Sequence, residues 1–136
     1  EVKTSGSTGE PKVIRHSKQA MVNSAITTGD FFNLNPGDKA LSCLPCSFIA
    51  GKMMVVRAIM LGLELDVITP SLTPYFNPRK AYDFCAMIPL QMQNSLDRID
   101  NIKILLVGGA GVNESLIEIT FIENNFHALR SHDSEA

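Results

Sequence analysis

Near its N-terminus the sequence carries a run of hydroxyl and glycine residues that ends on a lysine, Thr4-Ser-Gly-Ser-Thr-Gly-Glu-Pro-Lys12. The two glycines leave the backbone uncovered, so that successive N–H groups can point into one concavity and hold an anion. The hydroxyl groups add donors that suit the oxygens of a polyphosphate, and Lys12 adds a positive charge. This pattern indicates a phosphate site made by Lys12 and six further residues: Thr4, Ser5, Gly6, Ser7, Thr8 and Gly9.

The same composition is also typical of a solvated connection between two strands, and the residue types alone leave that interpretation open. The run is not the P-loop of NTPases, because Gly6 and Gly9 are too close together and no Ser or Thr follows Lys12. It also differs from the Gly-x-Gly-x-x-Gly pattern of dinucleotide-binding proteins. The kind of phosphate site that this loop could form therefore has to be inferred from the order of its residues.

Alternating strand and helix patterns are expected to position this loop. Residues 1–4 can end one strand and residues 12–15 begin another, so that the loop joins two neighbouring strands. Ser17 is a suitable N-cap for the first helix, and Gly62 a suitable end for the second. We expect helices over about 18–32, 48–61, 89–96 and 114–124, and strands over 39–44, 63–69, 83–88 and 103–107.

This alternation predicts an α/β fold with a largely parallel sheet flanked by helices. Loops that leave the carboxyl ends of parallel strands gather at one edge of the sheet. Residues 45–51 and 108–111 follow two of the predicted strands. We therefore expect these two segments to face the same cleft.

The composition fits one globular domain, with 136 residues, 45% of them hydrophobic and 19% charged. A net charge of -2 gives no basic field for nucleic acid or a membrane surface. The longest apolar run, residues 53–63, contains Arg57 and is too short to span a bilayer. We expect a cytoplasmic protein without nucleic-acid or membrane partners.

The cysteines and histidines do not form a recognisable metal or redox set. Cys43 and Cys46 have Cys-x-x-Cys spacing, but no second pair follows, and free thiols in a reducing cytosol are expected. No two of the three histidines lie four residues apart, as a pair of metal ligands on one helix face would. The sequence therefore predicts no metal-ligating residues.

The nine residues from Thr4 to Lys12 resemble, at every fixed position, the phosphate-loop signature of the AMP-forming acyl-adenylate synthetases. This family includes acyl-CoA synthetases, luciferases and the adenylation domains of peptide synthetases. The resemblance implies part of the large N-terminal domain of such an enzyme, with Lys12 as a catalytic residue. It also implies ATP, Mg²⁺ and coenzyme A as cofactors and a small-molecule carboxylic acid as the substrate.

A second resemblance follows the last predicted parallel strand. The segment Ile104-Leu-Leu-Val-Gly-Gly-Ala110 resembles the Gly-Gly-Ala segment of the same family, although Gly111 stands where proline is frequent. A tight strand-to-helix connection is the alternative interpretation. The resemblance implies an adenine and acyl pocket lined by Gly108, Gly109 and Ala110.

In a third resemblance, the segment Leu44-Pro-Cys-Ser-Phe-Ile-Ala-Gly51 resembles the family's Leu-Pro-Leu-Phe-His-x-x-Gly stretch, with Phe48 where histidine is frequent. It implies that Phe48 and Gly51 belong to the acyl-substrate site. Simple packing of Phe48 in the core is an equally open interpretation.

Arg57 lies in a predicted helix that is apolar on all sides, where a charge is costly unless it is paired or reaches solvent. It could bind a carboxylate through two parallel hydrogen bonds, while a snorkelling or salt-bridged arginine is the alternative. The segment Gly51-Lys-Met-Met-Val-Val-Arg57 resembles the o-succinylbenzoate-CoA ligases of menaquinone biosynthesis. That resemblance implies a dicarboxylic aromatic acid and places Arg57 in the acyl-substrate site.

We expect residues 1–125 to be a fragment of the N-terminal AMP-binding domain and residues 126–136 to be a disordered or atypical tail. The family's Tyr-Gly-x-Thr-Glu segment, whose glutamate binds Mg²⁺, does not occur in these 136 residues. We therefore expect no turnover by these residues alone. A non-catalytic nucleotide- or phosphate-binding module and a purely structural α/β fragment remain alternatives.

Overall fold

The computed structural model describes residues 2–4, 12–14, 17–108, 116–123 and 125–132. Strands β1 (Val2–Thr4) and β2 (Lys12–Ile14) form an antiparallel hairpin. The other strands of the described residues form a six-stranded sheet in the order β4-β3-β5-β6-β7-β8. Its parallel strands are β3 (Lys39–Ser42), β4 (Glu64–Val67), β5 (Tyr82–Met87) and β6 (Ile102–Gly108). The antiparallel strands are β7 (Leu116–Glu123) and β8 (Asn125–His132).

The helix ends follow the capping residues of the sequence. Helix α1 (Lys18–Phe32) begins after Ser17, whose Oγ accepts a hydrogen bond of 3.0 Å from the N–H of Ala20. Helix α2 (Ile49–Leu61) ends at Gly62, which has a left-handed φ of 72°. Two short helices follow, α3 (Pro89–Gln93) and the 3₁₀ helix η1 (Ile99–Asn101). None of the helices within the described ranges is long and apolar enough to cross a membrane.

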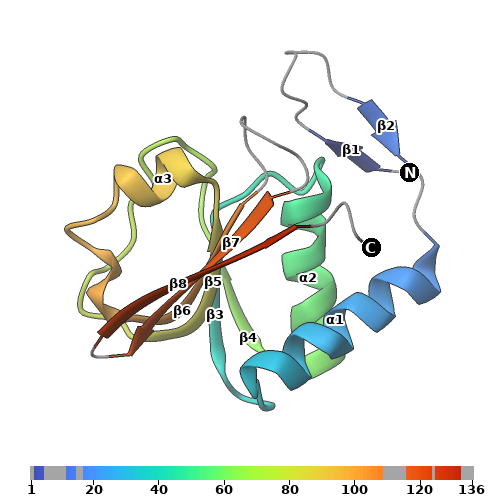
Figure 1. The fold of residues 1–136 in the computed structure, drawn as a ribbon, viewed down its shortest axis with the longest axis horizontal. Coiled ribbons are helices and arrows are strands. Elements are labelled where there is room, and N and C mark those ends of the chain that lie inside the picture. Colours follow the sequence, from blue (N-terminus) through green and yellow to red (C-terminus); the bar gives the residue numbers. More distant parts are fainter. Residues whose placement is uncertain (1, 5–11, 15–16, 109–115, 124, 133–136) are drawn as a thin grey trace.

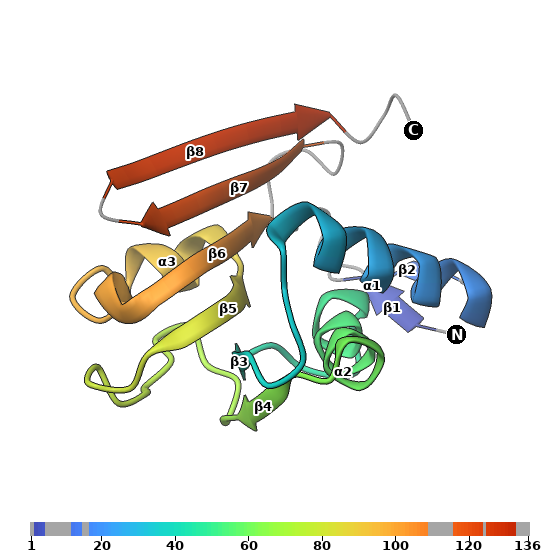
Figure 2. The ribbon, with the colours of Figure 1, turned by 90° about the horizontal axis from the view of Figure 1, so that it is seen from below.

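Helices cover both faces of the parallel sheet, which confirms the predicted α/β fold (Figures 1 and 2). On one face α1 and α2 pack against the strands, in a core that contains Phe32, Met54, Ala58 and Phe84. On the other face, α3, η1 and the chain between β4 and β5 cover a second core. This second core contains Leu41, Cys43, Phe76, Tyr82, Cys85, Met87, Ile99, Ile102, Leu105 and Val107. Residues of both cores alternate along β3 and β5, as the two-residue period of a strand requires.

The C-terminal part departs from the prediction. The helix expected over residues 114–124 is wrong, because residues 116–123 form β7, which pairs with β6. The sequence Leu116-Ile-Glu-Ile-Thr-Phe-Ile-Glu123 is rich in β-branched residues, and pairing with the edge of β6 outweighs its helical spacing. Residues 125–132 form β8, which pairs with the edge of β7; most of them belong to the segment 126–136, for which the sequence predicts a disordered or atypical tail.

Candidate functional site

The hairpin closes the donor-rich loop at its base. Thr4, the last residue of β1, pairs with Lys12, the first residue of β2, so that the chain returns on itself between these two positions. The hairpin lies beside α2, and Figure 1 shows it at the amino-terminal end of that helix. This confirms that the loop joins two neighbouring strands. The predicted ligands Ser5, Gly6, Ser7, Thr8 and Gly9 lie outside the described residues.

The carboxyl ends of β3 and β6 lie at the same edge of the sheet, on either side of β5. Ser42 at the end of β3 pairs with Ala86, and Met87 next to it pairs with Val107 near the end of β6. The segments that follow Ser42 and Gly108 therefore leave from the same edge, as predicted. Gly108 is half-buried at that edge, while Gly109 and Ala110 lie outside the described residues.

Gly51 sits in the first turn of α2, where that helix touches the chain leaving β3. A Cβ atom at this position would lie 2.1 Å from the carbonyl oxygen of Pro45 and 2.8 Å from that of Leu44. Both neighbours are backbone atoms, which cannot move aside as a side chain can. Only glycine fits here, so packing accounts for Gly51 without any contact to a substrate.

Phe48 occupies the N-cap position of α2 in extended conformation, with φ of −107° and ψ of 158°. Its N–H donates a hydrogen bond of 3.2 Å to the carbonyl oxygen of Pro45. The residue is half-buried, so its ring is not simply one of the core side chains. Phe48 belongs to the segment that follows β3, which leaves the sheet at the same edge as the segment that follows β6.

Arg57 lies two turns further along α2 and is 9% exposed. Its guanidinium carbon lies 5.7 Å from the centre of the Phe84 ring, and its Nη1 lies 3.7 Å from the sulfur of Met54. Its Nε has no hydrogen-bond partner, and no carboxylate of the described residues forms an ion pair with it. Burial lowers the pKa of Arg57 to about 10, because the charged form loses its hydration.

The three cysteines are free thiols. Cys85 of β5 and Cys43, which directly follows β3, are buried, whereas Cys46 is exposed, so the two thiols of the Cys-x-x-Cys pair lie in different environments. A hydrogen bond with Cys43, together with burial, raises the pKa of the Cys85 thiol well above its ordinary value. The neutral thiol of Cys85 therefore packs as a small apolar side chain.

Sequence reasoning missed three buried polar side chains of the described residues, Ser42, Gln91 and Ser95. The Oγ of Ser95 has no hydrogen-bond partner among the described residues. Ser42 is 1% exposed and its Oγ has no hydrogen-bond partner, while Gln91 is 3% exposed and fully bonded. For Ser42 and Gln91 the available signal was a polar residue among apolar ones. Ser42 lies between Leu41 and Cys43, and Gln91 follows Pro89 and Leu90. An open hollow of about 530 Å³ contains none of the predicted site residues and is lined by Val67, Ile68, Thr69, Ser71, Thr73 and Tyr75.

Comparison with known proteins gives one family. The sequence model of the family described as AMP-binding enzyme matches residues 4–124. A search of curated protein sequences finds no match.

Solved structures show the same fold. An acyl-CoA synthetase (AMP-forming)/AMP-acid ligase II-like protein from Dyadobacter fermentans is 24% identical, with a TM-score of 0.66 over 96% of this chain and 54% of that one. The o-succinylbenzoate-CoA synthetase of Bacillus subtilis in complex with its acyl-adenylate intermediate is 19% identical, with a TM-score of 0.64 over 80% of this chain and 24% of that one. The same synthetase with ATP and magnesium ion gives 19% identity and a TM-score of 0.64, over 79% and 24%. This chain thus spans about half of the first protein and about a quarter of the second.

Proposed function

Because the chain belongs to the AMP-binding enzyme family, we propose that it forms part of an enzyme that activates a carboxylic acid with ATP and passes the acyl group to coenzyme A. The observation that carries this proposal is the pairing of Thr4 with Lys12. This pairing closes, at its base, a nine-residue segment that is rich in hydrogen-bond donors. A loop closed in this way can direct N–H and hydroxyl groups at one anion.

The proposed reaction has two steps. A carboxylate oxygen of the acid attacks the α-phosphorus of ATP, the bond to the bridging oxygen breaks, and pyrophosphate leaves with the electron pair. The thiol sulfur of coenzyme A then attacks the acyl carbon, AMP leaves, and the thiol proton passes to solvent. Negative charge grows on the β- and γ-phosphates in the first step, and Lys12 with the loop residues from Thr4 to Gly9 stabilises it there.

The adenine and acyl groups are assigned to the edge of the sheet. Gly108 ends β6 at this edge, and we propose that Gly108, Gly109 and Ala110 run along the adenine. Phe48 lies where the chain leaves β3 at the same edge, and we assign its ring to the entrance of the acyl pocket. Gly51 contributes indirectly, since it allows α2 to pack against the carbonyl of Pro45.

We propose o-succinylbenzoate as the acid, which would place the enzyme in menaquinone biosynthesis. Arg57 supports this choice, because its buried guanidinium has no carboxylate partner among the described residues and a substrate with a second carboxylate would supply one. The similar synthetase of Bacillus subtilis was solved with the o-succinylbenzoyl adenylate, which agrees with this choice. ATP is expected to enter as its Mg²⁺ complex, since the similar synthetase of Bacillus subtilis was solved with ATP and magnesium ion.

Thermal unfolding with two ligands tests the proposal. We expect o-succinylbenzoyl adenylate to raise the melting temperature of the 136-residue chain by at least about 5 °C more than AMP at the same concentration, because only an acyl pocket adds to nucleotide binding. A control with the adenylate of acetic acid, which has no second carboxylate, should give a smaller shift.

Equal shifts by AMP and by o-succinylbenzoyl adenylate would instead favour a nucleotide-binding module without an acyl site. No shift by either ligand would leave the structural fragment as the remaining interpretation. Formation of acyl-CoA by the 136 residues alone would contradict our expectation that these residues bind without turnover.

A further inference from the structure

Gln91 of α3 joins three segments of the described chain through one buried amide group. Its Oε1 accepts a hydrogen bond of 3.1 Å from the N–H of Ile88. Its Nε2 donates to the carbonyl oxygens of Cys43 at 3.0 Å and of Ser71 at 2.8 Å. Gln91 is 3% exposed, so water does not compete for these hydrogen bonds. The amide group therefore holds the backbone of Ile88, Cys43 and Ser71 in place.

The carbonyl of Cys43 is where the chain leaves β3 for the proposed acyl pocket. Two residues later the carbonyl of Pro45 accepts the N–H of Phe48 at 3.2 Å. The same carbonyl oxygen lies so close to Gly51 that a Cβ there would be 2.1 Å away. The start of α2 is therefore packed directly against this short exit segment, and a shift of Cys43 is passed on to Phe48 and α2.

We propose that Gln91 is a positioning residue that fixes the exit of β3, and through it the place of Phe48 and Arg57 in the acyl pocket. This rests on the proposed function for the identity of the acid. The positioning itself rests on the three hydrogen bonds and on the contact between Gly51 and Pro45.

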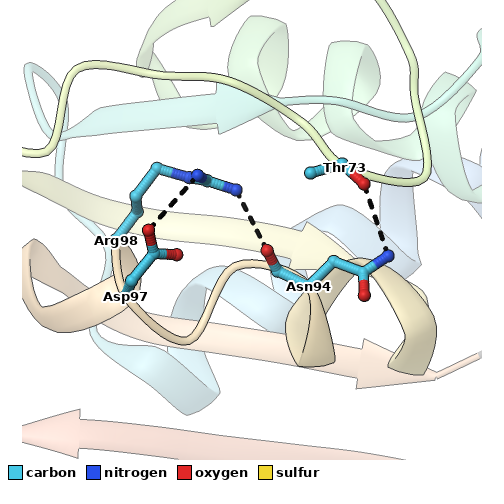
Figure 3. A network of polar contacts seen from close by, with 4 residues as sticks. All are labelled: Thr73, Asn94, Asp97 and Arg98. Atoms are coloured by element: carbon cyan, nitrogen blue, oxygen red, sulfur yellow. Dashed lines mark hydrogen bonds and ion pairs between the residues drawn. The ribbon is translucent and has the colours of Figure 1, made fainter.

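The neighbouring Asn94 provides a matched control. Its Nδ2 donates to the carbonyl oxygen of Leu72 at 2.9 Å and lies 3.5 Å from Oγ1 of Thr73, while its own carbonyl accepts from Arg98 at 3.0 Å. Arg98 also pairs with Asp97 at 3.4 Å (Figure 3). Asn94 thus holds the chain after β4 as Gln91 does, but its side chain bonds to Leu72 and Thr73 and not to the exit of β3.

The test compares Gln91→Glu with Asn94→Asp, two substitutions of nearly equal shape that each remove an amide donor. In Gln91→Glu, an ionised carboxylate would lose both bonds to the carbonyls of Cys43 and Ser71, and a protonated carboxyl could keep only one of them. We expect amide hydrogen exchange in residues 44–52 to rise at least about tenfold in Gln91→Glu. In Asn94→Asp we expect faster exchange only in residues 71–75.

Binding separates positioning from general loosening of the fold. In Gln91→Glu we expect the Kd for o-succinylbenzoate to rise at least about tenfold, while the Kd for ATP with Mg²⁺ stays within about twofold of the wild type. Gln91→Met removes the same donors without adding charge, and the same pattern is expected there if the glutamate variant does not fold.

Unchanged exchange in residues 44–52 in the folded variant would overturn the proposal, and so would equal losses of affinity for ATP and for the acid. Faster exchange in residues 44–52 together with a wild-type chain that binds ATP but no o-succinylbenzoate would support the positioning role and refute the proposed acid. The two ideas therefore fail in different measurements.

Discussion

Replacement of Arg57 with methionine is expected to weaken the binding of o-succinylbenzoate at least about 30-fold, a loss of about 2 kcal/mol. The same variant should be as stable as the wild type or more stable. Both expectations follow from one observation: Arg57 is 9% exposed and its guanidinium has no carboxylate partner among the described residues. A side chain kept for stability alone would show the opposite pattern.

The cost of burying Arg57 follows from its pKa. A pKa lowered to about 10 lies below the value in the unfolded chain, so the folded state is penalised wherever the side chain is protonated. The penalty is complete below about pH 10 and is relieved as the pH rises from there towards the ordinary value. It corresponds to about 3 kcal/mol and should be constant across neutral pH. Methionine has a similar volume and removes it.

Calorimetric titration and urea unfolding of both proteins at pH 7 check this prediction. A monocarboxylic analogue of the same acid is the matched ligand, and its affinity should change less than about threefold in Arg57→Met. Loss of stability in Arg57→Met, with equal effects on both acids, would show that Arg57 is a structural residue with a partner elsewhere in the chain.

Substitution of Gly51 with alanine is expected to destabilise the chain by at least about 3 kcal/mol, which lowers the melting temperature by roughly 10 °C. The added Cβ would lie 2.1 Å from the carbonyl oxygen of Pro45, so the start of α2 or the exit of β3 has to move. Thermal unfolding followed by circular dichroism measures the effect.

Gly29→Ala is the matched control, because Gly29 also lies in a helix and is buried. There the added Cβ would meet the end of the Leu61 side chain at 2.6 Å, which can rotate away. Alanine also favours the helix by about 1 kcal/mol. We expect little change or a gain in stability, and a Gly51→Ala variant as stable as Gly29→Ala would refute the close packing described for α2.

The parts of the fold that the sequence predicted well are those with local signals. Ser17 and Gly62 mark helix ends through their own backbone and side-chain chemistry, so α1 and α2 were predicted to within a residue. The segment 116–123 failed because its partner is distant in sequence. A run of β-branched residues is compatible with a helix until the free edge of β6 is known.

In the candidate site, too, local features were predictable and long-range contacts were not. The strand pairing of Thr4 with Lys12 and the shared edge of Ser42 and Gly108 were predictable from residue order and from the geometry of parallel sheets. The hydrogen bonds of Gln91 were not, since its partner Cys43 lies 48 residues earlier in the sequence. Hydrogen bonds of this range appear only when the fold brings their groups together.

The most direct test of the central claim is a titration of ATP with Mg²⁺ into the 136-residue chain, followed by calorimetry, in the wild type and in Lys12→Ala and Gly9→Val. Lys103→Ala is the control, since Lys103 is exposed near the start of β6. We predict one ATP per chain, affinity reduced at least about tenfold in both loop variants, and no change in the control. Binding of equal strength in all four proteins, or no binding to the folded wild type, would contradict the assignment of Thr4 to Lys12 as the phosphate site.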